Sequence, residues 1–245
     1  MTAQRGHDPV LLLVHGAWHG SWSWATLPRL LGAAGTRVLA VDLPGRDRGP
    51  TGGHDLAAHA DYLRSVAEDI DGPVAVLAHS YGGAVATQAL AGLPRLVTLI
   101  YLAAFMLEPG QSCRDANAVT PAGGPGLGPD LDGDYLVVPP AAARYLFYGG
   151  CTEQQAAAAT ARLTPEHLGT VTRPVAVAAW REVPTTYLVT RADKAISAQA
   201  QRAMAGKATW QAELDSGHSP MLTHPAQLTQ QVLAALARVD RHAAR

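Results

Sequence analysis

The sequence predicts an α/β protein in which a mostly parallel sheet is flanked by helices and interrupted by a helical insertion. Short apolar runs that suit strands alternate with segments of helical periodicity in the first half of the 245-residue chain. The connections between them are short, which favours right-handed crossovers between parallel strands. The alternation stops at residue 108 and resumes at residue 183, which indicates an insertion.

The first half begins with Val10 to Val14, a continuous apolar run that is typical of a strand buried on both faces. From Trp24 to Leu31, apolar residues recur at the spacing of one helix face, and Gly32 and Gly35 are expected to end that helix. The next elements are expected in this order: a strand over Thr36–Val41, a helix over Leu56–Ile70, a strand over Val74–Ala78, a helix over Gly82–Ala91 and a strand over Leu96–Ala103.

Residues 108–182 are expected to form a lid over the carboxyl ends of the strands, where open α/β sheets bind ligands. This insertion holds a Pro/Gly-rich segment, Pro121–Pro129, and no convincing strand. Because the two strands that follow it are too few for a separate core, residues 1–107 and 183–245 are expected to fold as one domain. The later elements are expected to be helices over Ala141–Tyr148 and Thr152–Leu163, strands over Thr185–Thr190 and Thr209–Leu214, and a last helix over Pro225–His242.

Composition argues against several classes of protein. Apolar residues make up 48% and charged residues 16%, as in ordinary globular proteins, and a formal net charge of -1 leaves no basic excess for nucleic acid. The N-terminus lacks an apolar signal region and no apolar run could span a bilayer, so a cytoplasmic protein without membrane contact is expected. Cys113 and Cys151 are expected to be free thiols. The sequence leaves a monomer and a homodimer equally open.

Ser80 is the candidate nucleophile. It stands in the run Ala78-His79-Ser80-Tyr81-Gly82, between an expected strand and an expected helix, which is the context of a nucleophile elbow. Gly82 and Gly83 supply the small neighbours that the sharp turn needs. Ala78 replaces the first glycine of the usual motif, so the match is imperfect. An isolated serine between small residues would otherwise be structural.

A serine needs a base, and the base needs a carboxylate that orients it. His218 is the best candidate for the base, since it lies in a loop between the last strand and the last helix. Asp193, just after the strand that ends at Thr190, is the candidate acid. Glu108 is the alternative acid, and Asp215 is too close in sequence to reach the ring easily.

The other histidines are given structural roles. His79 is expected to pack or orient rather than react, and His59 is expected to be solvated, with others in polar or helical contexts. His15 and His19 are four residues apart but lie in a glycine loop, and a third ligand at useful spacing is missing, so no metal site is expected.

The oxyanion of a tetrahedral intermediate needs backbone donors, which map to Ala17 and Tyr81. Gly16 lets the loop run close to a bound carbonyl. Many aromatic residues in these loops are expected to be ordinary packing. Four of them are candidates for lining an apolar substrate pocket: Trp18, Tyr145, Phe147 and Trp180.

Five stretches together resemble the α/β-hydrolase superfamily over nearly the whole chain, and within it the branch of plant methylesterases and hydroxynitrile lyases. They are VHGAWHGSWSW at 14–24, VLAVDLPG at 38–45, AHSYGG at 78–83, TRADKAI at 190–196 and GHSPML at 217–222. The resemblance implies acyl chemistry without a cofactor, with Ser80, Asp193 and His218 as the triad and Ala17 and Tyr81 as oxyanion donors.

Three positions bear on the choice within that branch. The lyases characteristically carry a threonine where this chain has Gly16, an acidic residue where it has His79, and a lysine where it has Ser219. All three favour ester hydrolysis, because a lysine beside the histidine would help to hold departing cyanide and this chain has none there. The leading hypothesis is therefore a carboxylesterase that acts on a small, largely apolar ester. The alternatives are a non-hydrolytic C–C lyase, decarboxylase or cyclase, and a small-ligand receptor.

Overall fold

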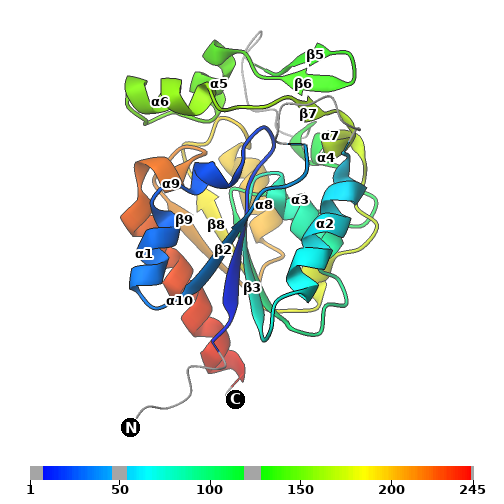
Figure 1. Ribbon diagram of the computed structural model, residues 1–245, viewed down its shortest axis with the longest axis vertical. Coiled ribbons are helices and arrows are strands. Elements are labelled where there is room, and N and C mark those ends of the chain that lie inside the picture. The colour runs from blue at the N-terminus through cyan, green and yellow to red at the C-terminus, as the bar shows by residue number, and fades with distance from the viewer. Residues whose placement is uncertain (1–7, 46–53, 119–127, 244–245) are drawn as a thin grey trace.

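The computed structural model describes residues 8–45, 54–118 and 128–243. Its centre is a six-stranded parallel sheet in the order β2-β1-β3-β4-β8-β9 (Figure 1). All the core strands expected from the sequence are confirmed, with ends that shift by at most one residue. They are β1 (Val10–Val14), β2 (Arg37–Val41), β3 (Val74–His79), β4 (Leu96–Leu102), β8 (Thr185–Thr190) and β9 (Trp210–Leu214).

Helices cover both faces of the sheet, which explains why every position of β1 and β3 is buried and why all of them except His79 are apolar. Successive side chains of a strand point to opposite faces. Leu12 therefore packs in the cluster that includes residues of α2 (Leu56–Glu68), α3 (Gly82–Ala89) and α8 (Ala198–Ala205). Leu13 packs on the other side, with residues of α1 (Leu27–Ala33) and α10 (Pro225–Ala243). Each of these buried leucines contributes about 1.5–3 kcal/mol through its removal from water.

The first helix differs from the expectation. A 3-10 turn, Ser21–Trp24, precedes α1, and Gly32 lies inside α1 instead of ending it. Gly35 is the residue that adopts the left-handed conformation after the helix, with φ of 90°. The expectation failed because an exposed glycine near a helix end costs only about 1 kcal/mol, which neighbouring contacts offset.

The insertion contains a small antiparallel sheet, so the expectation of no strand there is wrong. The sheet has the order β5-β6-β7, with β5 (Asp130–Asp132) and β6 (Tyr135–Val137) joined through Gly133, whose φ is 57°. A positive φ at the first position of a two-residue loop is typical of a β-hairpin. β7 (Glu166–His167) pairs with β6 from a distance of some thirty residues along the chain. Sequence patterns of two or three residues carry no periodicity, and this sheet was therefore not visible in the sequence.

The remaining elements of the insertion are helical. The two helices expected there are confirmed with shorter bounds, as α5 (Pro140–Leu146) and α6 (Glu153–Thr160), and the latter begins with a capping box at Thr152 and Gln155. The Pro/Gly-rich segment lies largely outside the described residues. The structure adds α4 (Cys113–Ala118), α7 (Gly169–Thr172) and a 3-10 turn, η2 (Ala179–Arg181).

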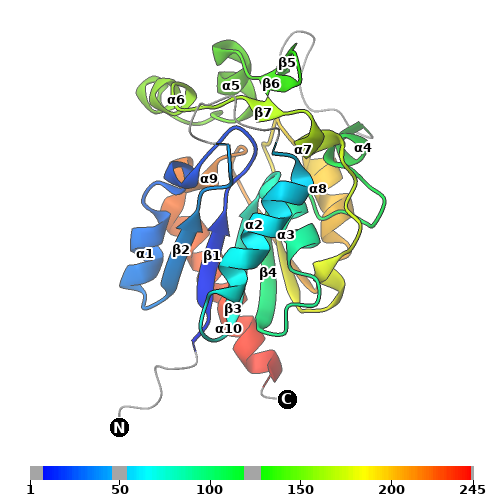
Figure 2. The ribbon, with the colours of Figure 1, turned by 45° about the vertical axis from the view of Figure 1, so that its right-hand side comes forward.

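The insertion lies over one end of the sheet (Figures 1 and 2). Figure 2 shows β1 running toward it, so the carboxyl ends of the parallel strands face α5, α6 and the small sheet. β1 begins, and α10 ends, at the opposite end of the molecule (Figure 1). In the part of the chain that the structure describes, no helix has the length and apolar character to cross a bilayer.

Candidate active site

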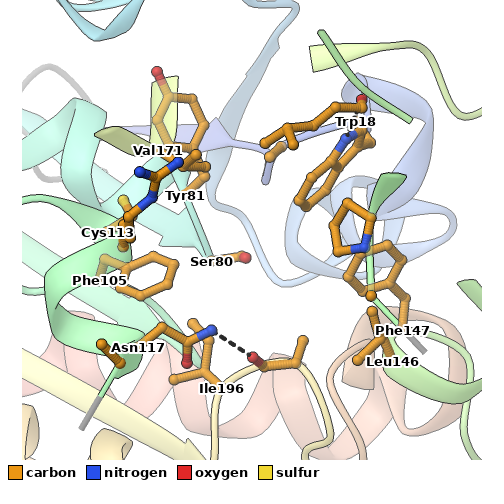
Figure 3. Close-up of a pocket in the computed structure, with 17 residues that line it drawn as sticks. Trp18, Ser80, Tyr81, Phe105, Cys113, Asn117, Leu146, Phe147, Val171 and Ile196 are labelled. Carbon is orange, nitrogen blue, oxygen red and sulfur yellow. Dashed lines mark hydrogen bonds between the residues drawn. The ribbon is translucent and has the colours of Figure 1, made fainter. Parts of the chain in front are cut away.

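Ser80 lies in the sharp turn between β3 and α3. Its φ is 54°, a left-handed conformation that is uncommon for a residue with a side chain. The turn is fixed from both sides, since the Ser80 N–H donates to the carbonyl of Leu102 (3.2 Å) and the Phe105 N–H donates to the carbonyl of Ser80 (3.1 Å). This turn presents Ser80 to a cavity at the carboxyl end of the sheet (Figure 3).

Two glycines after Ser80 let α3 approach the sheet. A Cβ atom at Gly82 would lie 2.6 Å from two carbonyl oxygens at the end of β1, and one at Gly83 would lie 2.8 Å from a carbonyl oxygen after β4. Both distances are too short for a real carbon atom. Ala78, which stands in place of the first glycine of the usual motif, is buried in β3 between β1 and β4. The elbow therefore tolerates a methyl group there.

Asp193 and His218 are in direct contact. The Nδ1 atom of His218 lies 2.7 Å from Oδ2 of Asp193, and both side chains are buried. This carboxyl group accepts further hydrogen bonds, which fix its orientation. Their donors are Thr190 Oγ1 (2.9 Å) and Gln201 Nε2 (2.8 Å) at Oδ2, and the backbone N–H groups of Ala195 (2.7 Å) and Ile196 (3.0 Å) at Oδ1.

The hydrogen bond that the triad would need between Ser80 and His218 is not formed among the described residues. Such bonds are often long before substrate binds and tighten in the complex. His79, which precedes Ser80 in the chain, contacts His218 directly. Its ring centroid lies 4.6 Å from that of His218, and its Nε2 atom lies 2.9 Å from the carbonyl oxygen of His218.

His79 is confirmed as a packing residue, and its surroundings keep it uncharged. Burial, followed by the neighbouring His218 and His19, holds the pKa of His79 well below its usual value of 6.5. With its Nε2–H donating to the carbonyl of His218, the ring is fixed beside the loop that carries the candidate base. This contact could not be predicted from the sequence, because the two residues are 139 positions apart.

The two alternative acids lie elsewhere. Glu108 pairs with Arg181 and with Lys207, the latter at 3.4 Å, and Asp215 pairs with Arg191 at 3.3 Å. The pairs of Glu108 are half-buried, and that of Asp215 is exposed. Of the three carboxyl groups weighed from the sequence, only Asp193 contacts His218.

The loop after β1 lies directly against Ser80. A Cβ atom at Gly16 would be 2.9 Å from Cβ of Ser80 and 3.4 Å from its Oγ, so any side chain there would crowd the hydroxyl. Ala17 and Tyr81, the two candidate oxyanion donors, both line the cavity that contains Ser80. The N–H of Ala17 has no hydrogen-bond partner among the described residues, as a donor reserved for a ligand would require.

His59 is buried, so the expectation that it is solvated is wrong. It is 1% exposed, and its Nδ1 atom lies 2.9 Å from the hydroxyl of Tyr81. Its Nε2 atom lies 3.2 Å from the carbonyl oxygen of Pro44. A histidine on the inner face of α2 thus anchors the side chain that follows the candidate nucleophile.

The cavity has a volume of about 400 Å³ and a mainly apolar lining. Trp18 and Phe147, two of the four aromatic residues expected to line it, do so (Figure 3). Tyr145 and Trp180 do not. Tyr145 is 36% exposed, and Trp180 packs beneath Lys207 and donates from Nε1 to the carbonyl of Leu107 (2.8 Å). Their assignment to the substrate pocket is therefore corrected.

Four residues of α4 that were not expected there also line the cavity: Cys113, Arg114, Asn117 and Ala118. Cys113 is buried, and burial raises the pKa of its thiol, so it is a neutral apolar wall. Arg114 brings a charge to the lining, and Asn117 donates from Nδ2 to the carbonyl of Ala195 at 3.4 Å (Figure 3). Cys151 is buried too, and both cysteines are free thiols, as expected.

The described residues contain no group of three or more histidine, cysteine, aspartate or glutamate side chains with the arrangement of a metal site. His15 and His19 instead bond to the backbone of their own loop. Nδ1 of His15 lies 2.8 Å from the carbonyl oxygen of Gly16, and Nδ1 of His19 lies 2.7 Å from that of Ala17. These contacts stiffen the loop that passes Ser80.

Known proteins resemble this chain along most of its length. The model of the alpha/beta hydrolase family matches residues 11–231. The pFDCC methylesterase MES16 of Arabidopsis thaliana is 36% identical over 118 residues, a stretch that spans only 45% of either chain. Methylesterase 17 of the same plant is 25% identical over 243 residues, which cover 89% of this chain and 87% of the relative. The crystal structure of MES16 superposes with a TM-score of 0.78 at 25% identity and covers 94% of this chain and 99% of its own.

Proposed function

Because this chain belongs to the alpha/beta hydrolase family, we propose that it is a serine carboxylesterase that cleaves a small, largely apolar ester. One observation carries the proposal: a buried aspartate–histidine pair and a serine on a sharp strand-to-helix turn are brought to one end of the sheet, and the serine faces an apolar cavity. The named methylesterase relatives support the hydrolytic reaction over a lyase reaction.

The arrangement suits acyl transfer through Ser80. The Oγ atom of Ser80 attacks the ester carbonyl while Nε2 of His218 takes its proton, and Asp193 holds the imidazole through Nδ1 and stabilises its positive charge. The backbone N–H groups of Ala17 and Tyr81 would hold the oxyanion. The alcohol leaves with the proton from His218, and water then releases the acid from the acyl-enzyme by the same steps.

The substrate's size and polarity follow from the cavity. A volume of about 400 Å³ accommodates a small molecule. Leu136, Leu146 and Phe147 of the insertion line it opposite the core, which supports the role of residues 108–182 as a lid. The relatives named as methylesterases support a methyl ester as the first substrate to test.

The test is a change of Ser80 to alanine. We expect Ser80→Ala to lose at least about 1,000-fold of the turnover of para-nitrophenyl acetate and of a methyl ester panel, as removal of a nucleophile does. A fluorophosphonate probe should add its mass to Ser80 of the unmodified protein. Ser65→Ala, on the exposed face of α2, is the control and should react normally.

Retention of activity by Ser80→Ala would contradict the proposal. Labelling of Ser80 without hydrolysis of any ester would favour a non-hydrolytic reaction at the same serine instead of ester hydrolysis.

The proposed location is the cytoplasm. The two free thiols support it, because a reducing compartment keeps cysteines unpaired.

A further inference from the structure

Trp18 has a backbone conformation that tryptophan rarely adopts. Its φ is 62°, in the left-handed region that a bulky residue rarely enters. Such a conformation persists where the surrounding structure enforces it, and these sites cluster where function needs a fixed geometry. Trp18 directly follows Ala17, the candidate oxyanion donor, and both line the cavity of Ser80.

Three hydrogen bonds from the insertion hold Trp18. Its backbone N–H donates to Oε2 of Glu166 at 2.9 Å, and its carbonyl accepts from the N–H of Thr164 at 3.0 Å. Its indole Nε1–H donates to the carbonyl of Leu136 at 2.9 Å. Both backbone groups of Trp18 and its side chain are thus bonded to residues more than a hundred positions away.

Glu166 is the unusual member of this set. It lies on β7 and is only 2% exposed, although a carboxyl group is costly to bury unless it is well bonded. An apolar residue would serve the packing of β7 at lower cost. Its side chain reaches across to the loop after β1 and accepts from a backbone group there.

This contact fixes the peptide beside the oxyanion donor. The N–H of Trp18 and the carbonyl of Ala17 belong to one planar peptide unit. Glu166 holds the N–H side of this plane, and Nδ1 of His19 lies 2.7 Å from the carbonyl oxygen on its other side. His19 is in turn 3.0 Å from the hydroxyl of Tyr148 in the insertion. With this plane fixed, the direction of the adjacent Ala17 N–H is restricted.

We propose that Glu166 is a positioning residue for the oxyanion hole: from the insertion, it holds the Ala17–Trp18 peptide so that the N–H of Ala17 points at the reacting carbonyl. The inference rests on the proposed function and adds a role for the insertion beyond covering the pocket. Because the donor is required only when charge develops on the oxygen, loss of Glu166 affects the chemical step more than substrate binding.

The kinetic test compares Glu166→Ala with Glu166→Gln. We expect Glu166→Ala to lower kcat for para-nitrophenyl acetate by about 100-fold, the usual effect of losing one oxyanion donor, with KM changed by less than about threefold. Glu166→Gln keeps an acceptor oxygen of the same shape and should recover most of this loss. Binding of trifluoroacetophenone, which forms an oxyanion on the serine, should weaken in Glu166→Ala in parallel with kcat/KM.

Thr170→Val is the matched control for destabilisation of the insertion. It removes the hydrogen bond from Oγ1 of the buried Thr170 to the carbonyl of His167 at 2.7 Å, and none of the hydrogen bonds of Trp18 involves Thr170. We expect it to lower the melting temperature and to leave kcat within about threefold. An equal loss of kcat in Thr170→Val and Glu166→Ala would overturn the proposal, and so would a wild-type kcat in Glu166→Ala.

A second measurement does not depend on turnover. Hydrogen exchange of the Trp18 amide should be slow in the unmodified protein and at least about tenfold faster in Glu166→Ala, with no such change in Thr170→Val. Unchanged exchange would show that Glu166 does not hold the loop. If the unmodified protein hydrolyses no ester, the proposed function fails, and exchange together with trifluoroacetophenone binding still decides whether Glu166 fixes this peptide.

Discussion

At the scale of single residues, the carboxyl group of Asp193 accepts hydrogen bonds from four groups besides His218. Gln201 is central to this arrangement. Its Nε2 group donates to Asp193 Oδ2 at 2.8 Å and to the carbonyl of Ile196 at 2.8 Å, while its Oε1 accepts from the N–H of Thr190 at 2.9 Å. The side chain is completely buried. One glutamine thus joins the end of β8 to the loop that carries the acid.

Replacement of Gln201 by leucine should therefore affect both stability and turnover. The change removes the acceptor of the buried Thr190 N–H and one donor to Oδ2 of Asp193, and leaving buried polar groups unsatisfied costs about 1–3 kcal/mol. We expect the free energy of unfolding in urea to fall by that amount and kcat to fall by roughly tenfold, because the imidazole is then less well oriented.

Gln199→Leu is the control, since Gln199 lies exposed on the same helix and none of the hydrogen bonds around Asp193 involves it. An unaltered kcat in Gln201→Leu would show that the remaining donors hold Asp193 without it.

At the scale of elements, the contact of α3 with β1 positions Ser80. The closest approach is at Gly82, where an added methyl carbon would lie 2.6 Å from backbone oxygens that cannot move without distorting β1. The helix and the strand therefore fix the turn between them. Substitutions here test how much of the elbow depends on this close approach.

We expect Gly82→Ala to lower the free energy of unfolding by about 1–3 kcal/mol, the usual range for overpacking of a close contact. Gly32→Ala is the matched control: Gly32 is exposed on α1, with nothing within 4 Å of the added carbon, and the change should stabilise by up to about 1 kcal/mol. Thermal unfolding of both variants is the measurement. If Gly82→Ala were as stable as the unmodified protein, the inference that close contact between α3 and β1 fixes the turn would be wrong.

The core elements could be predicted from the sequence because each has a periodicity of its own. β1 and β3 are buried at every position and apolar at all but His79, as strands between two layers of helices are. Asp55 caps α2 through the N–H groups of Ala57 and Ala58. The small sheet could not be predicted. Its strands have two or three residues, and β7 joins it only through the tertiary fold.

In the candidate site, too, some residues could be predicted from the sequence and others could not. Ser80, Asp193 and His218 stand at the ends of recognisable strands, so their order along the chain carried the signal. Glu166 and Gln201 act through contacts set by packing, and Tyr145 and Trp180 fall outside the cavity for the same reason. An aromatic residue on a helix can face either way, and the sequence of the insertion does not decide which.

At the scale of the whole molecule, the burial of His79 makes stability depend on pH. His79 packs against His218, with His19 and His15 near enough to act on its charge, and burial holds its pKa far below 6.5 in the folded state. The unfolded chain takes up a proton near pH 6.5 and the folded protein does not. The contribution of His79 to stability is therefore complete above this pH, and it is lost progressively as the pH falls from 6.5 toward the lower pKa of the folded state.

We expect the free energy of unfolding to decrease between about pH 7 and pH 5, with a contribution from His79 of at most about 1.4 kcal/mol per pH unit. In His79→Gln this slope should be shallower, because the group that titrates is gone while a donor for the carbonyl of His218 remains. Urea unfolding at a series of pH values measures both. Identical slopes in the two proteins would assign the acid sensitivity to other groups.

The placement of the pocket has a practical consequence. β1 begins and α10 ends on the side of the molecule that faces away from the insertion (Figure 1). A protein immobilised on a solid support through a short linker beside either of these elements would thus keep its cavity turned toward the reaction medium. Attachment through the exposed Tyr145 in the insertion would instead turn the insertion and the cavity toward the support. Because the parallel strands all end beneath the insertion, attachment at the opposite end of the sheet is the orientation in which this protein could be used as a surface-bound reagent.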